Sequence, residues 1–250
     1  MIKTALITGA TSGIGKACAI KFAQNNYNLI LTGRRDDRLQ QLKKELTKNF
    51  KVEITTLTFD VRNREEVKSA IDTLKGQTID VLINNAGLAA GLDPIQEGSM
   101  DDWDQMIDTN VKGLLYITRN VAPLMVEKKS GHIINIGSIA GREVYPKGNV
   151  YCASKHAVDA LTKGMRIDLL ESGIKVTQIA PGAVETEFSM VRFKGNQQTA
   201  DNVYKGFEPL HPEDIADVAF YVTTLPAHVN INDLLIMPTA QANGTTINRK

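Results

Sequence analysis

The sequence predicts an α/β fold in which helices cover both faces of a doubly wound parallel sheet. Short runs rich in β-branched residues alternate with longer amphipathic segments along the whole chain. Several of the short runs are apolar at every position, as in strands that are buried on both faces. A glycine-rich turn follows the first run directly. Because alternating strands and helices join into a parallel sheet through right-handed crossovers, we expect three layers.

The predicted elements follow one another without an internal repeat or linker, which indicates a single domain over residues 1–250. Strands are expected where apolar and β-branched residues are concentrated, at 4–8, 28–32, 52–59, 80–84, 132–137, 175–180 and 233–237. Helices are expected where the pattern is amphipathic, at about 13–25, 35–48, 63–75, 101–127, 150–171 and 212–224. Asp101 and Asp214 lie near the first turns of two of these helices, where carboxylates favour the helix dipole. Residues 182–210 are too long for an ordinary connection, so we expect a substrate loop there.

The composition excludes several functional classes. Charged residues make up 23% of the chain, hydrophobic residues 42%, and the net charge is +1, so nothing favours a nucleic-acid or membrane partner. Cys18 and Cys152 have no metal or redox spacing, and the four histidines are too dispersed for a zinc site. The chain shows no signal-peptide pattern and no apolar run of membrane-spanning length. We therefore expect a cytoplasmic protein without a metal.

The turn after the first predicted strand reads TGATSGIG. Glycine permits positive φ and lets backbone N–H groups approach a phosphate without a Cβ in the way. The helix that follows presents unpaired N–H groups and partial positive charge at its N-terminus. The order strand, glycine turn, helix predicts a dinucleotide site, and the missing GK[ST] ending argues against a nucleotide-triphosphate loop. The cofactor-binding residues expected here are Gly9, Thr11, Ser12, Gly13, Ile14 and Gly15.

The second predicted strand ends in LTGRR, which favours NADP over NAD. A carboxylate near this position holds the ribose 2′-hydroxyl of NAD, whereas arginine pairs with the 2′-phosphate of NADP. The planar fork of arginine also stacks on adenine. Arg34 and Arg35 are therefore expected to select NADP, although Asp36 and Asp37 follow them directly.

Further motifs resemble those of the short-chain dehydrogenase/reductase family over the length of the chain. They are the glycine turn, NNAG at 84–87, Asn110, Ser138, the pair Tyr151 and Lys155, and the PG dipeptide at 181–182. The resemblance implies a single-domain Rossmann-type fold with about seven parallel strands, and a homotetramer, because many members are tetramers. It also implies further cofactor contacts along the nucleotide, at Asp60, Val61, Asn85, Ala86, Gly87, Tyr151, Lys155, Pro181, Gly182, Val184 and Thr186.

Tyr151 and Lys155 are spaced for proton transfer. A carbonyl reduction needs a proton at oxygen, but a free tyrosine has a pKa of about 10, too high for efficient exchange near neutral pH. Residues four apart share a helix face, so the Lys155 ammonium is expected to lower the pKa of the Tyr151 phenol. Ser138 follows a buried strand and is expected to donate a hydrogen bond to the substrate oxygen. By the resemblance, Asn110 holds a water that relays protons from Lys155.

Two other kinds of catalytic centre fit the sequence poorly. GSIAG around Ser138 lacks the order G-x-S-x-G of a hydrolase elbow, since Ile136 stands two residues before the serine. Cys152 has no identifiable base, so we expect it to pack in the core.

The end of the chain directs the substrate prediction. Many family members carry a VDGG-like segment after the last strand, whereas this chain has HVNINDLLIMPTAQ. That segment and TEFSMVRFKG resemble the branch that oxidises 3-hydroxy acids, including serine and allo-threonine dehydrogenases. Arginine binds a carboxylate bidentately, so Arg192 is the first candidate for a substrate clamp and Arg142 the second, with Ser138 and Tyr151 as the other substrate-binding residues.

We therefore expect an NADP-dependent oxidoreductase that interconverts the 3-hydroxyl of a small hydroxy acid and its carbonyl. Two alternatives stay open at this point. Within the family, the chain could be a broad carbonyl or 3-oxoacyl reductase. From another class, it could be a non-catalytic NADP-binding sensor, although a sensor has no need of Ser138, Tyr151 and Lys155 together.

Overall fold

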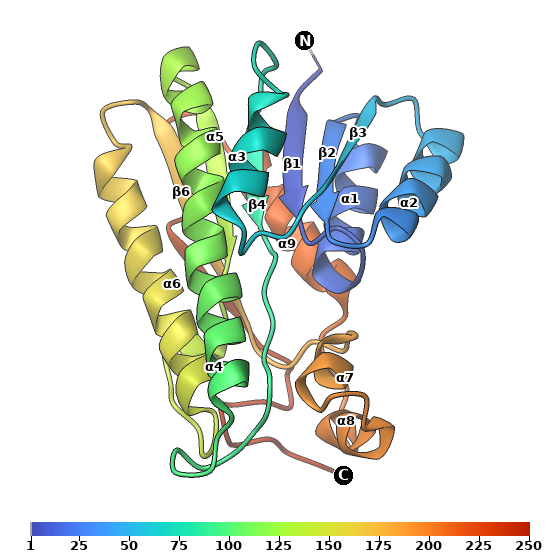
Figure 1. Cartoon of the computed structure of the whole chain (residues 1–250), viewed down its shortest axis with the longest axis vertical. Coiled ribbons are helices and arrows are strands. Elements are labelled where there is room, and N and C mark those ends of the chain that lie inside the picture. Colours follow the sequence, from blue (N-terminus) through green and yellow to red (C-terminus); the bar gives the residue numbers. More distant parts are fainter. Residues whose placement is uncertain (1) are drawn as a thin grey trace.

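A sheet of seven parallel strands forms the centre of residues 2–250, the part of the chain that the computed structural model describes (Figure 1). Its order is β3-β2-β1-β4-β5-β6-β7, so the chain builds one half outward from β1 and then crosses over to build the other. The strands are β1 (Thr4–Thr8), β2 (Asn28–Gly33), β3 (Ile54–Thr58), β4 (Val81–Asn84), β5 (Gly131–Ile136), β6 (Ile174–Pro181) and β7 (Asp233–Ile236). The predicted doubly wound α/β fold is confirmed, and each predicted strand lies within two residues of the observed one.

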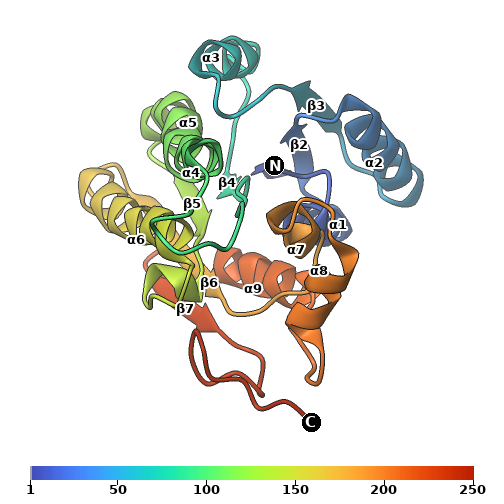
Figure 2. The ribbon, with the colours of Figure 1, turned by 60° about the horizontal axis from the view of Figure 1, so that its bottom comes forward.

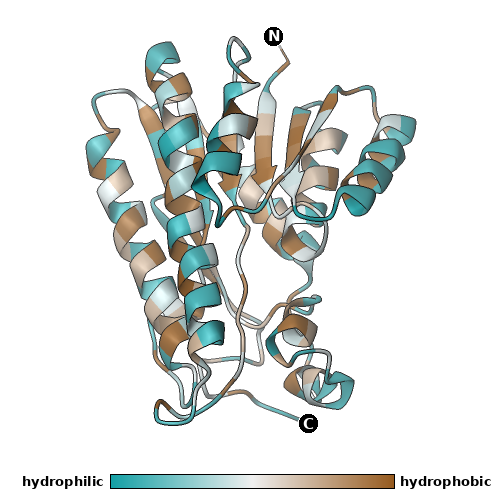
Figure 3. Ribbon diagram, in the orientation of Figure 1, coloured by the Kyte–Doolittle hydropathy of each residue, from teal (hydrophilic) through white to brown (hydrophobic). Residues whose placement is uncertain are grey.

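Helices cover both faces of the sheet (Figure 2). One face is covered by α1 (Gly13–Gln24), α2 (Asp36–Asn49) and α9 (Pro212–Thr224), and the other by α3 (Arg64–Asp72), α5 (Leu114–Lys128) and α6 (Asn149–Asp168). Successive strand side chains point to opposite faces, so Ala5 and Ile7 of β1 join one core while Leu6 joins the other. Several strands are accordingly apolar on both faces, whereas the outer helix surfaces are largely hydrophilic (Figure 3).

The helix expected at 101–127 is wrong in one respect, because it is not continuous. It consists of α4 (Met100–Ile107), the π-helical segment η1 (Asp108–Gly113) and α5. A π-helical turn adds a residue without requiring any special residue type, so the sequence pattern does not reveal it. Such segments are frequent at functional sites, and this one carries Asn110.

Residues 182–210, which we call the α7–α8 loop, lie beyond the carboxyl ends of the strands (Figure 1). They contain two short helices, α7 (Phe188–Arg192) and α8 (Gln197–Tyr204). The Gly91 N–H donates to the Arg192 carbonyl at 3.0 Å, and Lys194 pairs with Asp102 at 2.9 Å. The loop is thereby attached to the connection after β4 and to α4.

Three properties bear on function. None of the helices in residues 2–250 combines the length and apolar composition needed to cross a membrane. The same residues contain no group of three or more histidine, cysteine or carboxylate side chains able to hold a metal ion. Cys18 and Cys152 are both buried and unbridged.

Candidate active site

A cavity of about 610 Å³ opens at the carboxyl edge of the sheet. Ligands of open α/β sheets bind at this edge, and the volume lies within the range of cofactor and small-molecule sites. The predicted site residues that line it are Gly9, Thr11, Ser12, Gly13, Ile14, Arg34, Arg35, Asp60, Val61, Asn85, Ala86, Gly87, Ser138, Tyr151, Lys155, Pro181, Gly182, Val184, Thr186 and Arg192. Among the predicted residues, Gly15, Asn110 and Arg142 are not part of its wall.

The glycine turn forms a cradle that side chains would fill. Gly9 and Gly13 have φ of +66° and +50°, a region that favours glycine. A Cβ on Gly13 would lie 3.2 Å from Thr186, and a Cβ on Gly15 would lie 2.3 Å from the Gly9 carbonyl oxygen. Gly15 therefore supports the turn from behind instead of facing the cavity. The first turn of α1 has no acidic residue, and Ser12 makes no side-chain cap. The N–H groups there fit an anionic phosphate.

The glycine turn is held against the end of β4 by a buried hydroxyl that the sequence did not single out. Thr8 Oγ1 accepts from the backbone N–H groups of Asn85 and Ala86, both at 3.0 Å. The Asn85 side-chain amide donates to the carbonyls of Thr8 and Gly9 at 2.9 and 3.2 Å. Asn85 therefore fixes the turn as well as lining the cavity.

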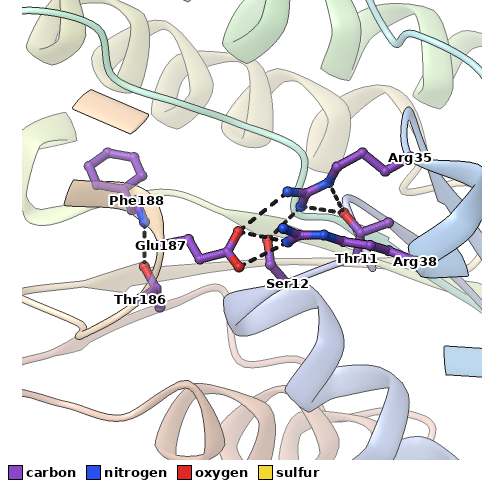
Figure 4. Close-up of polar contacts among 7 residues, drawn as sticks. All are labelled: Thr11, Ser12, Arg35, Arg38, Thr186, Glu187 and Phe188. Carbon is purple, nitrogen blue, oxygen red and sulfur yellow. Dashed lines mark hydrogen bonds and ion pairs between the residues drawn. The ribbon is translucent and has the colours of Figure 1, made fainter. Parts of the chain in front are cut away.

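The two arginines after β2 point to different neighbours. Arg35 donates to Thr11 Oγ1 at 2.7 Å and to Ser12 Oγ at 3.1 Å, so its guanidinium lies against the glycine turn (Figure 4). Arg34 pairs with Asp60 across a longer gap of 3.7 Å. Both line the cavity at the end where the resemblance implies the adenosine ribose. A cationic rim at this position suits a 2′-phosphate.

Ser138, Tyr151 and Lys155 come together on the framework of β5 and α6. Ser138 precedes the short helix η2 (Ile139–Gly141), and its Oγ accepts from the Ala140 N–H at 3.1 Å. Lys155 Nζ donates to the Ile136 carbonyl at 3.0 Å and lies 6.0 Å from the centre of the Tyr151 ring. All three reach the same cavity.

The pKa of the Tyr151 phenol is shifted upward, opposite to the expected direction. Burial raises the pKa of Tyr151, the neighbouring Tyr145 adds to the rise, and the Ser138 hydroxyl and the Arg192 charge partly oppose it. Burial lowers the pKa of Lys155 to about 8. The expected lowering of the phenol pKa by Lys155 is therefore wrong for this structure, since desolvation of the phenol outweighs the nearby charges. Both shifts favour the uncharged form of the side chain.

Asn110 lies behind the cavity wall and is 2% exposed. Its Nδ2 donates to the Leu88 carbonyl at 2.8 Å and to Ser154 Oγ at 3.0 Å, while its Oδ1 accepts from the Leu88 N–H at 2.8 Å. Both amide hydrogens are therefore used. The side chain thus joins the connection after β4 to α6. A water bound by Asn110 would have to donate to the remaining acceptor site of Oδ1.

Arg192 extends from α7 toward Tyr151. Its Nη1 donates to Tyr145 Oη at 2.9 Å and its Nε to the Gly91 carbonyl at 3.3 Å. Its guanidinium carbon lies 5.6 Å from the centre of the Tyr151 ring. The Nη2 group is buried and has no hydrogen-bond partner within residues 2–250. Burying a hydrogen-bond donor without an acceptor costs free energy, and an acceptor atom of a bound ligand would satisfy this nitrogen.

Arg142 is directed away from the cavity. The chain turns at η2, and the exposed Arg142 side chain forms an ion pair with Asp233 of β7. The structure therefore brings Arg192, and not Arg142, to Ser138 and Tyr151.

Four further residues of the site carried no motif. Thr8 supports the glycine turn, Tyr145 holds Arg192, and Arg38 and Glu187 form an ion pair beside Arg35. Their partners are up to 152 positions away in the chain, so no local spacing could have identified them.

Comparison with known proteins agrees with this geometry. Residues 3–197 match the family model described as short chain dehydrogenase. The NADP-dependent 3-hydroxy acid dehydrogenase YdfG of Salmonella typhi is 50% identical over 240 residues, which cover 95% of both chains. Sulfoacetaldehyde reductase 2 of Chromohalobacter salexigens is 48% identical over 240 residues, or 95% of this chain and 94% of the relative.

Solved structures show the same relationship in three dimensions. The closed form of serine dehydrogenase complexed with NADP⁺ superposes with a TM-score of 0.91 at 47% identity, covering 99% of this chain and 100% of the other. Serine dehydrogenase from Escherichia coli superposes with a TM-score of 0.82 at 43% identity, covering 96% and 99%. With its fold and most of its length matched, this chain belongs to the short-chain dehydrogenase/reductase family.

Proposed function

We propose that this protein is an NADP-dependent oxidoreductase that interconverts the 3-hydroxyl of a small hydroxy acid and the corresponding carbonyl. The observation that carries the proposal is the buried, unpartnered Nη2 of Arg192 beside Tyr151. A guanidinium edge at that distance from a proton donor suits a substrate with an acid group a short way from the reacting carbon. The names of the relatives, a 3-hydroxy acid dehydrogenase and a serine dehydrogenase, support the same substrate class.

The cofactor end of the proposal rests on residues that fit a phosphorylated dinucleotide. The glycine turn and the start of α1 bind the pyrophosphate, and Arg34 and Arg35 bind the 2′-phosphate. Asp60 and Val61 line the wall near the adenine, Asn85, Ala86 and Gly87 line it further along the cofactor, and Thr186 faces the glycine turn. When bound, NADP supplies or accepts the hydride.

Two side chains act directly on the substrate oxygen. Ser138 Oγ donates a hydrogen bond that orients the oxygen, and Tyr151 Oη gives it a proton during reduction. Because burial raises the pKa of Tyr151, the phenol stays protonated at neutral pH and is ready to act as the acid. In the oxidative direction, the positive charge of Arg192 and the Ser138 hydrogen bond favour the phenolate that accepts the proton. Lys155, with its pKa lowered to about 8, exchanges protons with the relay to solvent.

The cellular setting belongs to the same proposal. We place the protein in the cytoplasm as a homotetramer, as the family resemblance suggests. Exposed apolar side chains on α5 and α6 support self-association, with Ile167 74% exposed and Val126 38%. Light scattering coupled to gel filtration checks the assembly, and a monomer at micromolar concentration would contradict it.

The substrate class is tested by comparing acids with neutral alcohols of the same length. We expect NADP-linked oxidation of 3-hydroxypropionate, serine, allo-threonine or 3-hydroxybutyrate to exceed that of 1-propanol in kcat/KM. Arg192→Gln is expected to raise KM for the acids by about 10- to 100-fold, the usual loss for a charged hydrogen bond, and to leave the neutral alcohols unchanged.

Arg142→Gln is the matched control, because it removes the same charge from an arginine outside the cavity. Equal effects of Arg192→Gln on acids and neutral alcohols would contradict the clamp and favour a broad carbonyl reductase. Cofactor binding without turnover of any substrate would favour a sensor.

A further inference from the structure

Glu187 occupies an anion site between two arginines at the cofactor end of the cavity (Figure 4). Its carboxylate oxygens accept from Arg38 Nη1 at 2.9 and 3.0 Å, and Arg35 Nη1 lies 3.4 Å from one of them. Glu187 is the N-cap residue of α7, while Arg38 belongs to α2 and Arg35 immediately precedes it. The ion pairs therefore connect the α7–α8 loop to the end of β2.

Arg35 places the Glu187 carboxylate close to the glycine turn, because its guanidinium contacts both. Arg35 Nη2 donates to Thr11 Oγ1 and Ser12 Oγ, so one edge of the fork is fixed to the glycine turn and the other faces Glu187. Thr186, the preceding residue, accepts from the Phe188 N–H at 3.1 Å and holds the start of α7 beside the turn. Glu187 thus lies within reach of the residues that would hold the phosphorylated ribose.

The ion pairs are strong enough to keep the carboxylate charged but exposed enough to be exchanged. Partial burial acts to raise the pKa of Glu187, but hydrogen bonds and charges from Arg38 and Arg35 lower it below its ordinary value. The side chains of Glu187, Arg35 and Arg38 are 50%, 41% and 40% exposed, so water and salt screen their attraction. A phosphate monoester carries more negative charge than a carboxylate and offers three acceptor oxygens.

We propose that Glu187 holds the place of the cofactor 2′-phosphate and competes with it for Arg35 and Arg38. A phosphate that displaces the Glu187 carboxylate pairs with the guanidinium groups of both Arg35 and Arg38, although Arg38 itself does not line the cavity. Arg38 is then a third arginine that selects NADP, and phosphate binding releases α7 from α2. This inference rests on the NADP dependence proposed above.

The competition is tested with adenosine 2′,5′-bisphosphate and AMP, which differ by the 2′-phosphate alone. Isothermal titration of Glu187→Gln is expected to show about three- to tenfold tighter binding of the bisphosphate than wild type, with AMP unchanged. Glu185→Gln is the matched control, since it removes a charge two positions away that has no ion pair within residues 2–250. It should leave both affinities at wild-type values. Arg38→Gln should weaken the bisphosphate several-fold and leave AMP unchanged.

Hydrogen exchange provides a readout that does not depend on affinity. In wild type, the bisphosphate but not AMP should speed exchange of the amides in α7, because Glu187 is displaced from its partners. In Glu187→Gln these amides should exchange faster before any ligand is added.

Three outcomes overturn the competition: unchanged or weaker bisphosphate binding by Glu187→Gln, an equal gain by Glu185→Gln, or α7 amides that respond to AMP and bisphosphate alike. A wild-type protein with no preference for the bisphosphate over AMP would instead contradict the NADP dependence itself.

Discussion

Two regions of the molecule meet at the cavity, and they are built differently. The framework of β5 and α6 carries Ser138, Tyr151 and Lys155, whose residues are 9%, 8% and 7% exposed. The α7–α8 loop carries Arg192 as the last residue of α7, a helix of five residues, and Glu187 as its N-cap, and the side chain of Glu187 is 50% exposed. The framework therefore holds its side chains more rigidly than the loop does, which under the proposed function separates the groups that move protons from those that choose the ligands.

The largest effect is expected from the framework. Tyr151→Phe removes the proton donor but keeps the ring that packs 5.6 Å from Phe188. We expect kcat to fall by about 10³-fold, within the range for loss of a general acid, while the dissociation constant for NADPH stays near its wild-type value. Single-turnover kinetics and fluorescence titration of NADPH check the two parts. A variant that keeps more than about a tenth of kcat would contradict the role of the phenol.

The second prediction concerns the charge buried in the framework. The folded-state pKa of Lys155 is about 8, below its unfolded value of 10.5, so folding disfavours the ammonium form. Between these values the unfolded chain binds more protons than the native one, and stability rises with pH. Relative to Lys155→Met, the wild type should therefore gain roughly 2–3 kcal/mol of unfolding free energy between pH 7 and pH 10.

Urea unfolding of both proteins at the two pH values measures that gain. The difference between the proteins removes the contribution of other groups that titrate in the same range. Parallel changes in wild type and variant would show that the lysine is not desolvated.

The third prediction compares two threonines on neighbouring strands. Thr8 and Thr32 are register partners in β1 and β2, and both are buried. Thr8 Oγ1 accepts two backbone N–H groups, whereas Thr32 Oγ1 has no partner within residues 2–250. Thr8→Val should lower the unfolding free energy by about 2 kcal/mol because it leaves two donors unpaired. Thr32→Val should be neutral or stabilising, and equal losses would contradict the supporting role of Thr8.

The smallest effect on global stability is expected in the loop. Tyr204 Oη donates to the Val184 carbonyl at 2.8 Å and lies 2.8 Å from Ser189 Oγ, so it joins α8 to α7. Tyr204→Phe should lower the global unfolding free energy by less than about 1 kcal/mol, yet speed amide exchange in the loop several-fold. A global loss as large as that of Thr8→Val would show that the loop unfolds together with the framework and is not a separate, less stable region.

The same division explains what the sequence could predict. The glycine turn and the pair Tyr151 and Lys155 depend on spacing within one turn or one helix, and the sequence places them correctly. The strands were predictable because β1 and its neighbours are apolar on both faces. The π-helical turn at Asn110 was not, since it leaves the residue pattern unchanged.

Contacts between segments that are distant in the chain could not be predicted from the sequence either. The choice between Arg192 and Arg142 depends on Tyr145 and Asp233, which lie 47 and 91 positions from the arginines that they hold. The direction of the Tyr151 pKa also depends on burial, which the spacing to Lys155 does not reveal. Sequence therefore predicts which motif residues meet at the cavity better than it predicts their electrostatic environment or their contacts with distant segments.

One measurement tests the account at its centre. The protein is incubated with NADP⁺ and 3-hydroxypropionate that carries deuterium at both C3 positions, and the NADPH formed is analysed by mass spectrometry. We expect one deuterium in each NADPH, formed by wild type and by Arg142→Gln, and strongly reduced in yield with Arg192→Gln. NADPH without deuterium, or none formed from any 3-hydroxy acid, would contradict hydride transfer at this cavity.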